Sequence, residues 1–259
     1  SRSTTCRSVD CLADCELTSQ TGFKSFYCND CTDKLDYYTS EWKKLGFQPD
    51  GIYTGFLSSE KQVDKILDFI NSFETENTLV LVDPVMGDGG RTYSLFTDAL
   101  ACKMKKLVTV ADVITPNLTE CCILCNVDYC EFIKNADKPD FLDKIAELGK
   151  DLLNRYGVKI VIITGIEHKD IDGTMYVQNL IASKDEVFSV SCKKIGGSYS
   201  GTGDLFASVM FSGLLRGDTL RDTVSLAVKF IETSLRDTVA LGIDRNEGIE
   251  FEKHLKILL

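Results

Sequence analysis

The sequence predicts an α/β protein in which a mostly parallel sheet lies between two layers of helices. Amphipathic segments such as 59–73 and 139–156 alternate along the chain with apolar runs such as 78–82 and 158–165. These runs are rich in leucine and β-branched residues and lack a polar face, which is typical of strands covered on both sides. Alternating strands and helices require crossover connections, which favour parallel strands.

The other strands are expected where short apolar runs end in turn residues. Residues 51–57, GIYTGFL, reach a Thr-Gly pair, and the strand that opens 110–120 ends before Pro116, because proline disfavours helix in the preceding residue. Residues 173–182 and 186–192 alternate polar and apolar side chains around a Ser-Lys-Asp turn, which predicts a hairpin.

Helices are expected where apolar residues recur three or four positions apart. In 30–46, Leu35, Tyr38 and Trp42 follow this spacing, and Gly46 supplies a stop. The same pattern predicts helices at 59–73, 95–107, 139–156, 219–240 and 248–258.

Composition restricts the class of function. A net charge of −10 argues against a surface for nucleic acid or anionic membrane. No apolar run approaches the roughly 20 residues that cross a bilayer, and the first residues lack a signal-peptide core, so a cytoplasmic location is expected. The eleven cysteines include two CxxC pairs that could hold zinc. Their odd number favours reduced, unbridged thiols.

A glycine-rich stretch at 196–216 is the first candidate for chemistry. Gly201 and Gly203 flank Thr202, Asp204 follows, and apolar residues then recur at helical spacing. Free main-chain N–H groups at such a turn can bind an anion, aided by the helix dipole. Asp204 could take a proton from an alcohol there, or it could merely cap the helix.

A second candidate follows the strand at 78–82. The sequence DPVMGD places Asp83 and Asp88 at the carboxyl end of this strand, where open α/β sheets bind ligands. Two carboxylates in that place suit a Mg²⁺–phosphate site, although aspartates also cap turns. Residues 89–91, Gly-Gly-Arg, suggest a mobile flap.

Both stretches resemble the ribokinase-like superfamily, and most closely its pyridoxal kinase branch. GTGD before an apolar helix is similar to the anion hole and catalytic aspartate of that superfamily. DPVMGD is similar to pyridoxal kinases, whereas hydroxymethylpyrimidine kinases share DPVM and usually differ after it. The resemblance implies a ribokinase-like three-layer α/β/α sandwich with a mostly parallel central sheet, as a single kinase domain over residues 1–259.

The resemblance also implies roles for individual residues. Asp204 would be the catalytic base, and the amides of Gly201, Thr202 and Gly203 would hold the transferring phosphoryl group. Mg²⁺ would be organised by three carboxylates, and ATP would be contacted by residues at several strand ends. The metal residues are Asp83, Asp88 and Glu120, and the nucleotide residues are these three with Tyr93, Thr115, Asn117, Thr164 and Gly165.

The residues expected to lie near the substrate differ in part from the family pattern. Thr21 and Phe56 match positions beside the pyridine ring, but Gln20 stands where a histidine is common, and the aromatic at Phe56 is often a tyrosine. Residues 1–5, SRSTT, resemble the start of the first helix, and the strand that precedes it in the family is absent from the sequence.

The reaction implied is ATP-dependent phosphorylation of the 5′-hydroxymethyl group of pyridoxal, pyridoxine or pyridoxamine. The alternatives are a kinase of hydroxymethylpyrimidine or another small alcohol, and an inactive homologue that only binds a vitamer. The resemblance implies ATP and Mg²⁺ as cofactors and a homodimer, and it leaves a monovalent cation open.

Overall fold

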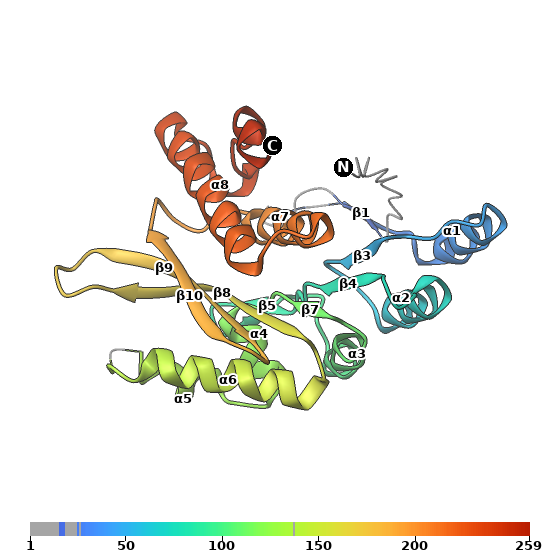
Figure 1. Ribbon diagram of the computed structural model, residues 1–259, viewed down its shortest axis with the longest axis horizontal. Coiled ribbons are helices and arrows are strands. Elements are labelled where there is room, and N and C mark those ends of the chain that lie inside the picture. Colours follow the sequence, from blue (N-terminus) through green and yellow to red (C-terminus); the bar gives the residue numbers. More distant parts are fainter. Residues whose placement is uncertain (1–15, 19–24, 26, 137) are drawn as a thin grey trace.

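A six-stranded sheet forms the centre of the structure, a computed structural model that describes residues 16–18, 25, 27–136 and 138–259 (Figure 1). Four neighbouring strands run parallel to one another, and a fifth strand pairs antiparallel with the strand on each side of it. This arrangement confirms the mostly parallel sheet. In order across the sheet, the strands are β10 (Val187–Lys193), β9 (Met175–Ser183), β8 (Ile160–Lys169), β7 (Val113–Ile114), β4 (Leu79–Val82) and β3 (Gly51–Thr54).

Helices cover both faces of this sheet, as the α/β/α prediction requires (Figure 1). Val80 and Val82 of β4 pack into the core beneath one helical layer, and Leu81 packs into the core beneath the other. The strand lacks a polar face because neither side meets water. One layer contains α2 (Glu60–Phe73), α3 (Asp98–Val108), α4 (Leu118–Cys125) and α6 (Phe141–Tyr156), with α1 (Thr32–Lys44) beside α2, and the other contains α7 (Thr202–Arg216) and α8 (Leu220–Leu241).

Polar caps and glycines fix where the helices begin and end. The side chains of Ser59, Thr97 and Thr219 each accept a hydrogen bond from the main-chain N–H three residues later, and so start α2, α3 and α8. The helices α6, α7 and α8 each end at a glycine with left-handed backbone angles, which a side chain would strain.

The helices α7 and α8 approach closely at a small residue. A Cβ added at Gly213 of α7 would lie 2.5 Å from Cγ2 of Thr223 on α8. Both residues are buried. The two helices can therefore pack at this distance only because Gly213 has no side chain.

Several short elements leave too little periodic signal to be predicted. They include two small antiparallel sheets, β1 (Glu16–Thr18) with β2 (Cys28–Asp30) and β5 (Gly87–Asp88) with β6 (Arg91–Thr92), and the short helix α5 (Tyr129–Ile133). The segment expected to be a helix at 248–258 forms a 3₁₀ helix, η2 (Glu252–Leu258), after a one-turn helix η1 (Arg245–Glu247). Within the described ranges, no helix has the length and apolar character needed to cross a bilayer.

Candidate active site

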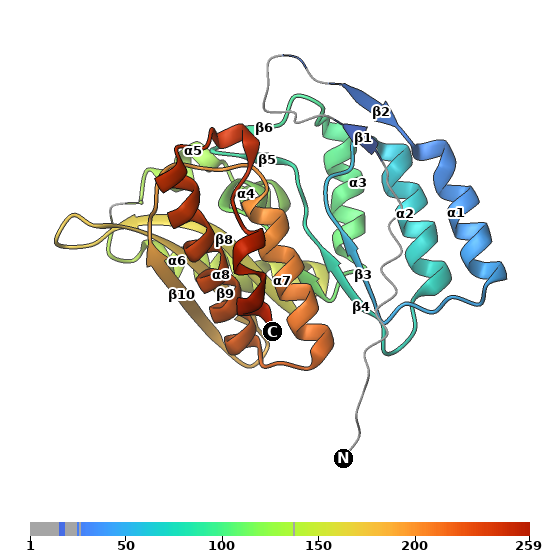
Figure 2. The same cartoon turned by 90° about the horizontal axis from the view of Figure 1, so that it is seen from above.

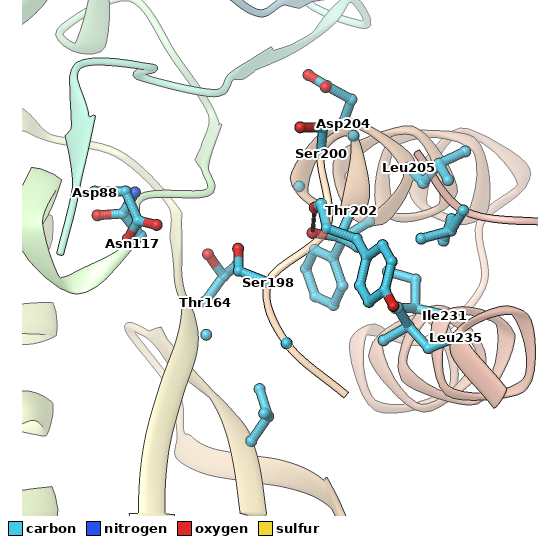
Figure 3. A pocket seen from close by; sticks show the side chains of 18 of the residues that line it. Asp88, Asn117, Thr164, Ser198, Ser200, Thr202, Asp204, Leu205, Ile231 and Leu235 are labelled. Atoms are coloured by element: carbon cyan, nitrogen blue, oxygen red, sulfur yellow. Dashed lines mark hydrogen bonds between the residues drawn. The ribbon is translucent and has the colours of Figure 1, made fainter. Parts of the chain in front are cut away.

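The carboxyl ends of the parallel strands and the glycine-rich turn line one cavity of about 1670 Å³. Figure 3 shows Asp88 and Asn117 on one side of it and Thr202 and Asp204 on the other. Every predicted site residue that the structure describes lines this cavity, whereas Thr21 lies outside the described residues. The lining residues from the prediction are Phe56, Asp83, Asp88, Tyr93, Thr115, Asn117, Glu120, Thr164, Gly165, Gly201, Thr202, Gly203 and Asp204.

A row of polar side chains follows the ends of three neighbouring strands. The N–H of Asp83 donates to the carbonyl of Thr54 at 2.8 Å, and the N–H of Thr115 donates to the carbonyl of Val82 at 3.2 Å. The hydroxyl of Thr54 is buried and has no hydrogen-bond partner among the described residues. Unpaired buried hydroxyls are costly and are typical of a site that a ligand completes.

Asp83 sits in this row with only 7% of its surface exposed. Burial, and then the charge of Asp204, raises the pKa of Asp83 to about 7, and the nearby Thr115 hydroxyl partly offsets this rise. A buried carboxyl with a raised pKa lacks a compensating positive charge. The site is therefore electrostatically prepared for a cation.

The glycine-rich turn opens α7 without a side-chain cap. Gly201 occupies the cap position with φ of 81°, and Asp204 follows in the first turn. Asp204 is thus not the cap that its position at a helix start allowed. Asp204 lines the cavity and remains exposed to solvent, and partial burial of its carboxyl raises its pKa (Figure 3). The first N–H groups of α7 remain available for an anion, beside a carboxylate that can accept a proton.

Tyr53 and Asp204 both lie near Gly55, and Tyr53 was missed by the sequence analysis. A Cβ added at Gly55 would lie 3.6 Å from the Tyr53 hydroxyl and 4.0 Å from Oδ1 of Asp204. Burial, and then Asp83 and Asp204, raises the pKa of Tyr53 far above its ordinary value. The only sequence signal was a tyrosine directly before the Thr-Gly pair, which a core position explains equally well.

Asn117 and Glu120 form a reciprocal cap at the start of α4. The N–H of Glu120 donates to Oδ1 of Asn117 at 3.0 Å, and the N–H of Asn117 donates to Oε2 of Glu120 at 2.8 Å. Oε1 of Glu120 accepts the N–H of Met86 at 2.9 Å, and Nδ2 of Asn117 donates to the carbonyl of Gly87 at 2.8 Å. Asn117 and Glu120 therefore join the DPVMGD segment at 83–88 to α4.

The carboxylates of the cavity provide the oxygen atoms that a hard cation prefers, but few of them lie close together. In the part of the chain that the structure describes, no three His, Cys, Asp or Glu side chains gather as a metal cluster. Both oxygens of Glu120 already accept main-chain N–H groups. Asp83 and Asp88 remain as oxygen ligands in the cavity lining, and carboxylate oxygens fit Mg²⁺ held partly through water.

The predicted Thr164–Gly165 pair lies beside the start of α4, where Thr164 forms a bridge with Asn117 and its N–H donates to the carbonyl of Pro116 at 2.9 Å. The two residues form an irregularity in β8, where the register with β9 shifts, and Gly165 has φ of 69°. The buried Asn179 of β9, which sequence reasoning missed, accepts the N–H of Gly165 at 3.3 Å. Tyr93 lies across the cavity, and burial followed by Glu120 raises its pKa to about 12.

Comparisons with known proteins identify the same architecture. The family model for phosphomethylpyrimidine kinase matches residues 42–248. A Schizosaccharomyces pombe protein assigned to the pyridoxal kinases is 29% identical over 171 residues, which are 64% of this chain and 47% of that relative. A hydroxymethylpyrimidine/phosphomethylpyrimidine kinase of Staphylococcus aureus is 27% identical over 198 residues, which are 76% of this chain and 66% of that relative. The chain thus spans about half the length of the first relative and about two thirds of the second.

Solved structures agree with the sequence comparison. A Bacteroides thetaiotaomicron protein assigned to the phosphomethylpyrimidine kinases, in a crystal form with pyridoxal, has a TM-score of 0.85 and 35% identity, covering 94% of this chain and 83% of its own. The pyridoxal kinase of Lactobacillus plantarum shares the fold, with a TM-score of 0.78 and 24% identity over 93% of this chain and 82% of its own. The chain belongs to the phosphomethylpyrimidine kinase family and has the ribokinase-like fold that this family shares with the pyridoxal kinases.

Proposed function

We propose that this protein transfers the γ-phosphoryl group of ATP to the 5′-hydroxymethyl group of a vitamin B6 vitamer. The observation that carries the proposal is the uncapped start of α7, where Asp204 lines the cavity beside free main-chain N–H groups. An alcohol kinase needs a proton acceptor and an anion site within reach of one another. The first turn of α7 supplies both.

Asp204 acts as the proton acceptor in this proposal. The alcohol oxygen attacks the γ-phosphorus, its proton passes to the Asp204 carboxylate, and the bond between that phosphorus and the bridging oxygen of ADP breaks. The N–H groups at Gly201–Asp204 hold the transferring group while its negative charge is redistributed. Partial burial of the Asp204 carboxyl raises its pKa and so increases its affinity for the proton.

Asp83 and Asp88 would hold the divalent cation on the phosphate side of the cavity, directly or through water. When bound, the cation offsets the charge of the phosphates. Glu120 acts through the main chain, because both of its oxygens are engaged by the N–H groups of Met86 and Asn117. Its role is to hold the segment that carries the aspartates.

The choice of a B6 vitamer rests on two observations. The DPVMGD segment at 83–88 matches the pyridoxal kinase pattern beyond the portion shared with hydroxymethylpyrimidine kinases. The Bacteroides relative, at 35% identity, was crystallised with pyridoxal. Phe56 lines the cavity and offers an aromatic face beside the acceptor. The alternative acceptor is hydroxymethylpyrimidine, for which the Staphylococcus aureus relative is named.

Initial-rate phosphorylation by the full-length protein with Mg-ATP tests the proposal. Pyridoxal, pyridoxine, pyridoxamine and hydroxymethylpyrimidine are compared, and Asp204→Asn is assayed beside the wild type. We expect turnover of the vitamers and its loss in Asp204→Asn, with nucleotide binding retained. Preference for hydroxymethylpyrimidine would keep the mechanism and change the substrate. Undiminished turnover by Asp204→Asn would refute the assigned base, and no turnover by a wild type that binds nucleotide would favour a binding-only homologue.

A further inference from the structure

The turn that joins β5 to β6 is docked against α4 and α5. Gly89 and Gly90 form its tip, with φ of 57° and 78°. The N–H of Gly90 donates to Oγ1 of Thr119 at 2.9 Å. A Cβ added at Gly90 would lie 2.5 Å from Cδ1 of Tyr129, so that the tip rests directly on this ring. Figure 2 shows β5 and β6 beside α4 and α5.

The base of the same hairpin is fixed separately. The reciprocal cap of α4 bonds Met86 and Gly87 through Glu120 and Asn117. Gly87 is itself packed against the opposite strand, because a Cβ there would lie 2.3 Å from the carbonyl oxygen of Arg91. The hairpin is therefore attached to α4 and α5 at two points, its base and its tip.

Asp88 lies between these two points. Its Oδ1 accepts the N–H of Gly89 at 2.8 Å, and among the described residues its other oxygen accepts no hydrogen bond. The side chain is exposed and lines the cavity. Because Asp88 is two residues from Gly90, a tip that leaves Thr119 and Tyr129 must also move the Asp88 carboxylate.

We propose that Thr119 and Tyr129 are positioning residues that dock the hairpin tip and thereby hold the Asp88 carboxylate where it meets the divalent-cation complex of the nucleotide. Neither side chain needs to react. Thr119 contributes a hydroxyl that accepts the Gly90 N–H, and Tyr129 contributes a ring face that excludes any larger residue at position 90. This inference rests on the proposed function for the identity of the ligand, although the docking itself does not.

A matched pair of variants tests the hydroxyl. Thr119→Val keeps the shape of the buried side chain and removes the acceptor, whereas Thr119→Ser keeps the acceptor. The first readout is trypsin cleavage after Arg91, an exposed residue of β6, followed by mass spectrometry of the fragments. The second is the dissociation constant of Mg-ADP by calorimetry, and the third is the KM for Mg-ATP against kcat.

Loss of one hydrogen bond should change these equilibria by about three- to tenfold. We expect Thr119→Val to be cleaved after Arg91 that much faster, to bind Mg-ADP that much more weakly, and to show a raised KM for Mg-ATP with unchanged kcat. Thr119→Ser should behave as the wild type. Equal cleavage and equal Mg-ADP affinity in Thr119→Val and the wild type would overturn the proposal.

Tyr129→Leu provides a second test that does not depend on the buried Thr119. Tyr129 is partly exposed, and leucine keeps an apolar contact while removing the ring face. Faster cleavage after Arg91 with weaker Mg-ADP binding is expected again, and wild-type values of both would contradict a role for the ring. If the wild type phosphorylates none of the tested alcohols, the proposed function fails, whereas the cleavage and Mg-ADP measurements still decide the docking inference.

Discussion

Oε1 of Glu120 accepts the N–H of Met86 at 2.9 Å, although the two residues are 34 positions apart in the sequence. Oε2 of the same carboxylate accepts the N–H of Asn117 at 2.8 Å. Glu120 is 3% exposed, and burial followed by the charge of Asp83 raises its pKa to about 8. A single buried carboxylate therefore joins the segment after β4 to the start of α4.

Replacing Glu120 should destabilise the protein before any effect on chemistry is considered. Glu120→Ala leaves two buried N–H groups without acceptors, which should lower the free energy of unfolding by about 2 kcal/mol or more. Glu120→Gln keeps one oxygen acceptor and should lose less. Urea denaturation of both variants and the wild type measures the difference. Three equal unfolding free energies would show that these bonds do not hold the segment.

Stability should fall as the pH rises from about 4 to about 8 in the absence of divalent cation. The pKa of Asp83 is raised to about 7 and that of Glu120 to about 8, mainly by burial. The unfolded chain loses both protons near pH 4, so that in this window the folded state binds more protons than the unfolded state. The contribution of these groups to the free energy of unfolding is complete below their pKa values in the unfolded chain. It is lost as the pH rises through their pKa values in the folded protein.

Asp83→Asn isolates the share of one carboxyl in that pH dependence. Asparagine cannot ionise, so the stability of the variant should fall less steeply with pH, with a slope smaller by up to about 1.4 kcal/mol per pH unit, and the variant should be more stable than the wild type near pH 8. Unfolding free energies at about pH 5 and pH 8 in chelator provide the measurement. Parallel slopes for variant and wild type would mean that Asp83 ionises normally in the folded state.

Gly55→Ala should weaken binding of the acceptor alcohol and leave binding of the nucleotide unchanged. The new methyl group would lie 4.0 Å from Oδ1 of Asp204 and 3.6 Å from the Tyr53 hydroxyl, which is ordinary contact and not a clash. It adds a group beside the proposed base, where the proposed acceptor alcohol would bind. We expect the KM for the vitamer to rise about tenfold. The KM for Mg-ATP in the same variant is the internal control, and a rise of both constants together would place the defect elsewhere.

Gly213→Ala should weaken the packing of α7 on α8. Its Cβ would lie 2.5 Å from Cγ2 and 2.9 Å from Oγ1 of Thr223, which is buried and cannot move into solvent. Overpacking of this kind costs about 1–3 kcal/mol. Combining the change with Thr223→Ala should recover part of the loss, and a double-mutant cycle by thermal unfolding measures the coupling. Purely additive losses would contradict the close approach.

The alternation of strands and helices, the apolar character of β4 on both faces, and the two stretches at 83–88 and 201–204 could all be predicted from the residues alone. These features follow from local chemistry, because a period of side chains, a pair of glycines or a strand that ends in aspartate is visible within a few residues. Their shared cavity followed from a general property of parallel sheets, whose carboxyl ends meet at one edge.

The side chains that support those stretches became visible only in the folded protein. Asp204 near Gly55, Asn179 bonded to the N–H of Gly165, and Thr119 bonded to the N–H of Gly90 bring together segments that no local pattern relates. The tertiary structure also decided that both carboxylate oxygens of Glu120 accept main-chain N–H groups, which joins the segment after β4 to the start of α4. The physical reason is common to these cases: hydrogen bonds and close packing depend on distances in space, whereas the sequence encodes only order along the chain.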